Sequence, residues 1–177
     1  FSGIPVKKIR DNAITEIDVK GVEDSKLEAC GGVILAHCLK SNSSVTVVEA
    51  SNCGMGTAGA KAFGDVLRVN KTLQHLNVSN NSFGKMQVGD QVKLKSSGEM
   101  KTVTFAYDDG DIDVEGGSGC VKPSEFEWES QVPAFCAGLA ASSSLLSVSD
   151  SMWCSGRLLR PFCGVGGCNF LHEKFPN

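Results

Sequence analysis

The chain has 177 residues, of which 41% are hydrophobic and 21% are charged, and its formal net charge is -3. These values are typical of folded globular proteins and exclude an intrinsically disordered chain. No run of eighteen apolar residues is present and the first residues lack the apolar stretch of a secretory signal, so we expect a cytoplasmic or nuclear protein with no membrane partner.

A strand-like pattern recurs three times within residues 12–84. Leucine-rich repeats follow L-x-x-L-x-L-x-x-N/C-x-L, in which alternate apolar residues of a short strand point inward and an Asn or Cys turns the chain. The first apolar positions of the three copies, Ile14, Val45 and Leu73, are 31 and 28 residues apart. The remaining matches are Ile17 and Val19; Val48, Ala50, Cys53 and Met55; and Leu76, Val78, Asn81 and Phe83.

A second apolar pattern lies between these strands and predicts helices. Its spacing of i, i+1, i+4 and i+5 makes one apolar helix face. The two sets that share it are Ile34, Leu35, Cys38 and Leu39, and Ala62, Phe63, Val66 and Leu67. Strand, turn and helix units of this kind bury their apolar faces by stacking, so we interpret Cys30, Cys38 and Cys53 as small core residues.

Residues 12–84 resemble the ribonuclease-inhibitor-like subfamily of leucine-rich repeat proteins. The resemblance implies a curved scaffold that binds other proteins on its strand face. The side chains expected to face that protein partner are Thr46, Val47, Glu49, Gln74, His75 and Asn77. No nucleophile, base and orienting group cluster among them, so we expect no enzyme activity.

A partial further copy is present at residues 131–150, where Phe135 and Leu139 are expected to form a closing helix. Asp150 stands where an inward apolar residue belongs, so the pattern ends there. With about three copies and no N-terminal cap, we expect the native chain to continue before Phe1.

Residues 85–130 change to the alternating pattern of strands and hold ten acidic residues against five basic ones. Asp109-Gly110, between two alternating runs, is a strong hairpin signal. The segment resembles small SH3-like or Tudor-like β-barrels, and Tudor-like domains read methylated side chains with an aromatic cage. Four rings are available, either for such a cage or, as we prefer, for the barrel core: Phe105, Tyr107, Phe126 and Trp128.

A calcium loop is excluded for Asp109, Asp111 and Asp113. The sixth and twelfth positions of such a loop would be Val114 and Cys120 rather than Gly and Glu.

The last segment, 151–177, combines three cysteines with a histidine in the spacing Cys154-x8-Cys163-x4-Cys168-x3-His172. Three thiolates and one imidazole satisfy tetrahedral zinc and leave no open position for a substrate. The spacing resembles CCCH-type zinc fingers, which commonly bind single-stranded RNA. That resemblance implies base stacking and phosphate contacts by Arg157, Arg160, Phe162, Phe170 and Lys174.

The sequence therefore predicts an α/β fold: a leucine-rich-repeat solenoid at 1–84, an inserted small SH3-like β-barrel at 85–130, a closing repeat at 131–150 and a small zinc-stabilised tail. The predicted function is that of a non-catalytic modular binding protein, with an unidentified protein on the repeat surface and single-stranded RNA on the zinc finger. One alternative is a protein-protein interaction scaffold without RNA binding. Another is a GTPase-activating-like regulator, although no catalytic Arg or Asn is marked.

Overall fold

The structure is a computed structural model that describes residues 3–21 and 27–149. It divides the chain into two compact units. The first is formed by the chain up to Phe83 and again from Gln131, and the second by Gly84–Ser130. No helix within the described ranges is long and apolar enough to cross a membrane.

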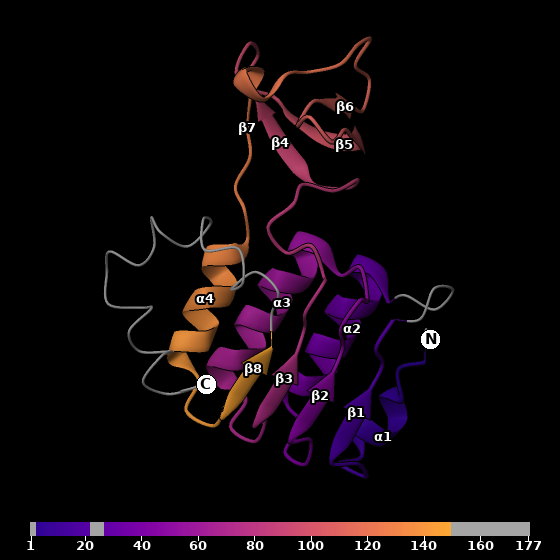
Figure 1. Ribbon diagram of the computed structural model, residues 1–177, viewed down its shortest axis with the longest axis vertical. Coiled ribbons are helices and arrows are strands. Elements are labelled where there is room, and N and C mark those ends of the chain that lie inside the picture. The colour runs from indigo at the N-terminus through magenta and orange to yellow at the C-terminus, as the bar shows by residue number, and fades with distance from the viewer. Residues whose placement is uncertain (1–2, 22–26, 150–177) are drawn as a thin grey trace. The chain divides into compact units, whose positions relative to one another are not determined.

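The first unit is a parallel sheet with helices along one face (Figure 1). Its strands are β1 (Glu16–Asp18), β2 (Val47–Glu49), β3 (His75–Asn77) and β8 (Ser147–Ser149), paired in that order. Its helices are α1 (Val6–Arg10), α2 (Glu28–Lys40), α3 (Gly56–Val69) and α4 (Val132–Ala141). Each helix packs against the next in this order, so the helices form one continuous layer.

The core of this unit lies between the sheet and the helices. The strand register places Ile17, Val48, Leu76 and Val148 in one row across the sheet, and the first three are buried. Leu35, Phe63 and Phe135 contribute from the helices. Helices α3 and α4 approach through glycine, because a Cβ atom on Gly138 would lie 2.2 Å from the Gly64 carbonyl oxygen.

Buried asparagines close the turns that lead from helix to strand. The Asn70 side-chain amide donates to the carbonyl oxygens of Leu39 (2.8 Å) and Asn42 (3.2 Å), and its oxygen accepts from the Leu73 amide at 2.8 Å. Asn42 makes the equivalent bonds one turn earlier, to the Ile9 carbonyl and from the Val45 amide. Each asparagine therefore joins its own turn to the preceding one.

The second unit is an antiparallel sheet of four short strands. They are β4 (Gln91–Leu94), β5 (Met100–Ala106), β6 (Ile112–Val114) and β7 (Phe126–Glu127), in the spatial order β6-β5-β4-β7. The Asp109-Gly110 turn joins β5 to β6, and Gly110 has a φ of +94°, which glycine adopts without strain. The small core consists of Val92, Val103, Ile112, Val114 and Phe126.

The predicted fold class, a leucine-rich-repeat solenoid with an inserted small β-barrel, is wrong. The structure is a mixed α/β unit with a parallel sheet, together with a curled antiparallel sheet that forms half a barrel. A solenoid grows by successive units along the chain, whereas β8 joins this sheet only after the chain has formed the whole second unit. A closed barrel requires its end strands to pair, and none of the described pairings joins β6 to β7.

Replacing Asn70 tests the role of the buried turns. Asn70→Ala leaves the buried Leu73 amide without a partner and removes the side-chain bonds to the carbonyl oxygens of Leu39 and Asn42. We expect the free energy of unfolding, measured by urea denaturation, to fall by roughly 2–4 kcal/mol. The exposed control Ser43→Ala should change it by less than about 0.5 kcal/mol. Equal stability of the two variants would contradict the role given to Asn70.

Candidate protein-binding face

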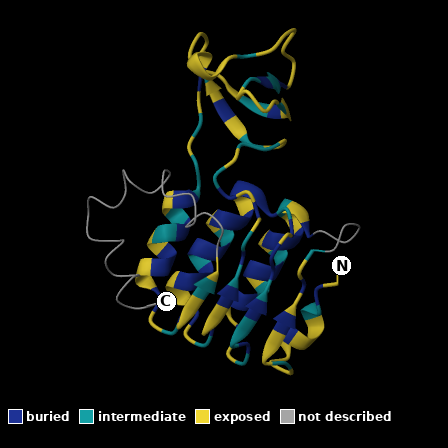
Figure 2. Cartoon of the chain, viewed as in Figure 1, coloured by how far each residue is buried: buried dark blue, intermediate teal, exposed yellow. Residues whose placement is uncertain are grey.

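The sheet face opposite the helices carries the side chains that lie between the buried strand positions (Figure 2). The strand register arranges them in rows that run across the four strands. One row holds Glu16, Val47, His75 and Ser147, and the next holds Asp18, Glu49, Asn77 and Ser149. All eight side chains are half-buried or exposed, so this face of the sheet is a pre-formed polar surface in the described part of the chain.

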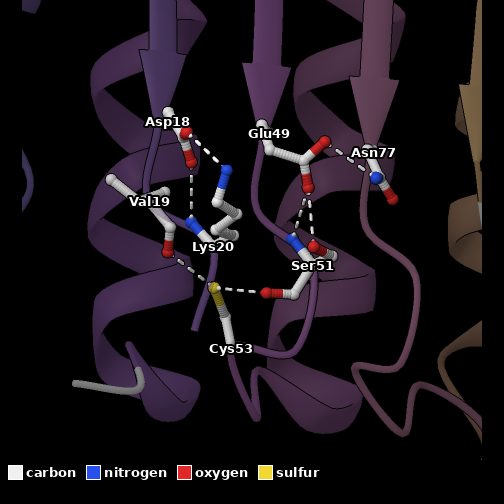
Figure 3. A network of polar contacts seen from close by, with 7 residues as sticks. All are labelled: Asp18, Val19, Lys20, Glu49, Ser51, Cys53 and Asn77. Carbon is white, nitrogen blue, oxygen red and sulfur yellow. Dashed lines mark hydrogen bonds and ion pairs between the residues drawn. The ribbon is translucent and has the colours of Figure 1, made fainter. Parts of the chain in front are cut away.

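Glu49 is the centre of a polar network at the ends of the strands (Figure 3). One carboxylate oxygen accepts a hydrogen bond of 2.8 Å from the Asn77 side-chain amide. The other accepts from the Ser51 hydroxyl at 2.6 Å and from the Ser51 amide at 3.3 Å. These donors are neutral, so they hold the Glu49 carboxylate in position without cancelling its charge.

Asp18 and Lys20 form an ion pair at the β1 edge of this network. The Lys20 ammonium lies 2.9 Å from one Asp18 oxygen, and the Lys20 amide donates to the other at 3.3 Å. The Lys20 side-chain hydrogen bond is the main reason that the pKa of Asp18 is below its usual value. The same bond raises the pKa of Lys20, so both groups are charged at neutral pH.

Cys53 lies beneath the network and is a structural residue. Its thiol contacts the carbonyl oxygens of Val19 (3.0 Å) and Ser51 (3.4 Å), and its side chain is fully buried. Burial raises the pKa of this thiol, so it is neutral and unreactive at neutral pH. The amide of Cys53 donates to the Asn81 side chain, which ties the turn after β2 to the turn after β3.

Of the six side chains that the sequence predicts for protein binding, Val47, Glu49, His75 and Asn77 lie in the strand rows of this face, and Thr46 and Gln74 directly precede β2 and β3. Glu49 and Asn77 are bonded to each other, while the backbones of Thr46 and Gln74 are linked by a hydrogen bond of 2.8 Å. Val47 and His75 are register partners on neighbouring strands.

Sequence reasoning missed the contributions of the two outer strands. These are Glu16, Asp18 and Lys20 beside β2, and Leu146 and Ser147 beside β3. The sequence signal for these two outer strands is their alternating apolar residues, which are Ile14, Ile17 and Val19 for β1 and Leu145 and Val148 for β8.

His75 is linked to β8 through a side-chain contact. Its Nδ1 lies 2.7 Å from the Ser147 hydroxyl oxygen, so the pair has the groups of a nucleophile and a base. A working pair needs a third group that orients the imidazole. Within the described ranges no side chain bonds to the other ring nitrogen, and both residues are exposed on an open face. The contact therefore positions His75 as a surface group.

The aromatic residues of the second unit do not form one cage. Phe126 is buried in the sheet core and Trp128 packs against that core. Phe105 and Tyr107 are instead 52% and 43% exposed, with ring centroids 4.7 Å apart, and the Tyr107 hydroxyl donates to Asp113 at 3.0 Å. The four rings thus divide into a core pair and a surface pair.

A pocket of about 590 Å³ opens elsewhere in the second unit, between the end of β4 and the glycine-rich loop after β6. It is lined by Leu94, Lys95, Val114, Cys120 and Glu125, among others. The Lys95 ammonium is already bonded to the Ser124 carbonyl oxygen at 2.9 Å. The Cys120 thiol and the Glu125 carboxylate likewise have partners within the fold.

The expected zinc ligands Cys154, Cys163, Cys168 and His172 lie outside the described residues, as do Arg157, Arg160, Phe162, Phe170 and Lys174. Within the described ranges, no group of three or more His, Cys, Asp or Glu side chains is placed to hold a metal ion.

Comparison with known proteins assigns no family to this chain. No family model and no curated protein matches it. Among solved structures it is similar to leiomodin-1 actin-binding site 2, with a TM-score of 0.43 and 14% sequence identity. That alignment covers 96% of this chain and 94% of the other. A likeness at this TM-score transfers neither fold nor function.

The surface pair of rings makes a spectroscopic prediction, because Tyr107 is the only tyrosine of the chain. Its hydrogen bond to Asp113 stabilises the neutral phenol and raises the pKa of Tyr107. The pKa of Tyr107 is higher in the folded state than in the unfolded state. The hydrogen bond therefore contributes fully to stability below the usual phenol pKa, and this contribution is lost as the pH rises through the raised folded-state pKa. Asp113→Asn should lower the pKa, measured by ultraviolet difference titration, towards its usual value. An unchanged titration would show that the bond does not form.

Proposed function

We propose that this protein is a non-catalytic binding module that holds a protein partner on the exposed face of the sheet β1-β2-β3-β8. The observation that carries the proposal is the hydrogen-bonded row of side chains centred on Glu49. These groups are fixed on paired strands before any partner arrives, so binding orders few side chains and loses little conformational entropy.

The composition of the face also favours a protein partner. It combines carboxylates, amides, hydroxyls and an imidazole with the half-buried Val47 and the exposed Leu146. Mixed polar and apolar surfaces of this kind are typical of protein-protein interfaces. Small-molecule sites are instead concave and mostly apolar.

Affinity capture with face and control variants tests this function. Gln74→Ala/His75→Ala removes two exposed side chains from the middle of the face, whereas Lys61→Ala changes the exposed surface of helix α3. We expect the double variant to retain its partner at least about tenfold less than wild type, as measured by quantitative mass spectrometry. Lys61→Ala should capture the same partner as wild type. Equal capture of the partner by wild type and both variants would contradict the proposed function.

Zinc-dependent binding of single-stranded RNA is the second candidate function, favoured by the cysteine and histidine spacing of residues 154–172. Three thiolates and an imidazole provide the ligands for a structural zinc ion, and the adjacent aromatic and basic residues have the chemistry of single-strand recognition. Without RNA binding, the protein would be an interaction scaffold only.

The zinc content of the purified protein distinguishes an RNA-binding zinc finger from a scaffold without RNA binding, because the finger requires bound zinc. Wild type purified under reducing conditions should contain one equivalent of zinc, and Cys168→Ser should lose it, because three ligands hold zinc far less tightly than four. Elemental mass spectrometry measures this directly. Absence of zinc from wild type would leave the scaffold as the function.

A further inference from the structure

The charges of the binding face are concentrated on one side of the sheet. Glu16 and Asp18 lie on β1, and Glu49 lies on β2. Lys20 is paired with Asp18 at 2.9 Å and is also attracted by Glu49, so a single cation is set against three carboxylates. The Glu16 side chain has no ion-pair or hydrogen-bond partner in the described part of the chain. The β1-β2 side of the face therefore has an excess of negative charge.

The opposite side of the same face is uncharged and partly apolar. Leu146, directly before β8, is 58% exposed and gives this side of the face an apolar side chain. Its amide donates to the Gln74 carbonyl oxygen at 2.7 Å, so it continues the pattern of bonds between β3 and β8. Ser147 and Ser149 follow on the exposed side of β8.

The separation of these two sides follows from the strand order. Neighbouring strands lie about 4.8 Å apart, so the three spacings from β1 to β8 amount to roughly 14 Å. An extended peptide advances about 3.4 Å per residue. A peptide that crosses the strands therefore spans the distance in about four residues, which places two side chains of the same peptide face at i and i+4.

We infer that the partner segment is a basic, extended stretch of polypeptide that crosses the strands, with Lys or Arg over β1 and β2 and an apolar residue about four positions away, over Leu146. The inference rests on the proposed function and names the chemistry of the partner. Charge complementarity favours a cationic partner residue, because the three carboxylates of Glu16, Asp18 and Glu49 exceed the single cation Lys20 on this side of the face. The exposed Leu146 side chain favours an apolar partner residue, because contact between the two removes apolar surface from water.

Fluorescence anisotropy with the full chain at low salt tests the inference. The probes are fluorescently labelled twelve-residue peptides that contain Arg-x3-Leu, Glu-x3-Leu or Arg-x3-Ser, with Gly and Ser elsewhere. We expect the Arg-x3-Leu peptide to bind about tenfold more tightly than Glu-x3-Leu, because an attraction becomes a repulsion at the same carboxylates. Loss of the leucine should weaken binding about fivefold.

Charge reversal on the protein provides the matched control. Glu16→Lys should weaken the Arg-x3-Leu complex about fivefold and should improve binding of Glu-x3-Leu. Asp65→Lys makes the same change of net charge on helix α3, which belongs to the helix layer, and should leave both affinities unchanged. Equal effects of the two reversals would show a general charge effect and would overturn the inference.

The remaining outcomes separate this inference from the proposed function. If none of the peptides binds, or if the Arg and Glu peptides bind equally, the inference is overturned. Should the Gln74→Ala/His75→Ala variant still lose a captured partner in that case, the proposed function stands with a partner of different chemistry. If that variant also retains the partner, both fail.

Discussion

The parallel sheet depends on the asparagines that close its turns. Asn42 and Asn70 each use one side chain to satisfy the carbonyl groups at the end of a helix and the amides that start the next strand. Each also bonds to the turn of the previous strand, so consecutive strands are held in register. Without these bonds the buried amides of Val45 and Leu73 would lack partners, at a cost of roughly 1–3 kcal/mol each, which is a large share of the stability of a small domain.

Register in turn determines which side chains lie on the exposed face of the sheet. Because side chains alternate along a strand, aligning Ile17, Val48 and Leu76 in the core necessarily aligns Asp18, Glu49 and Asn77 on the other side. The Asn77 amide can then reach Glu49, and Ser51 can reach the same carboxylate. The turns that precede β2 and β3 thus control the positions of charged groups on the exposed face of the sheet.

Local patterns predicted the strands and helices well, and the global fold poorly. The alternation around Val48 and Leu76 and the helical spacing around Phe63 depend on neighbours in the sequence, which is why they could be read directly. The second sheet stays open because none of the described pairings joins β6 to β7, and no local sequence pattern reports whether strands distant in the chain pair. Similarly, strand alternation would place Phe105 on the same face as the buried Val103, yet Phe105 is exposed, because the register of β5 against β6 shifts between these two residues.

A cationic partner segment that covers the β1-β2 side of the exposed sheet face should protect the carboxylates there from chemical modification. Carbodiimide labelling of carboxylates, followed by mass spectrometry, measures this for the free chain and for the chain saturated with the Arg-x3-Leu peptide. The account predicts that labelling of Glu16 falls on binding while labelling of Asp65 on α3 does not change. Protection of Asp65 with continued labelling of Glu16 would contradict it.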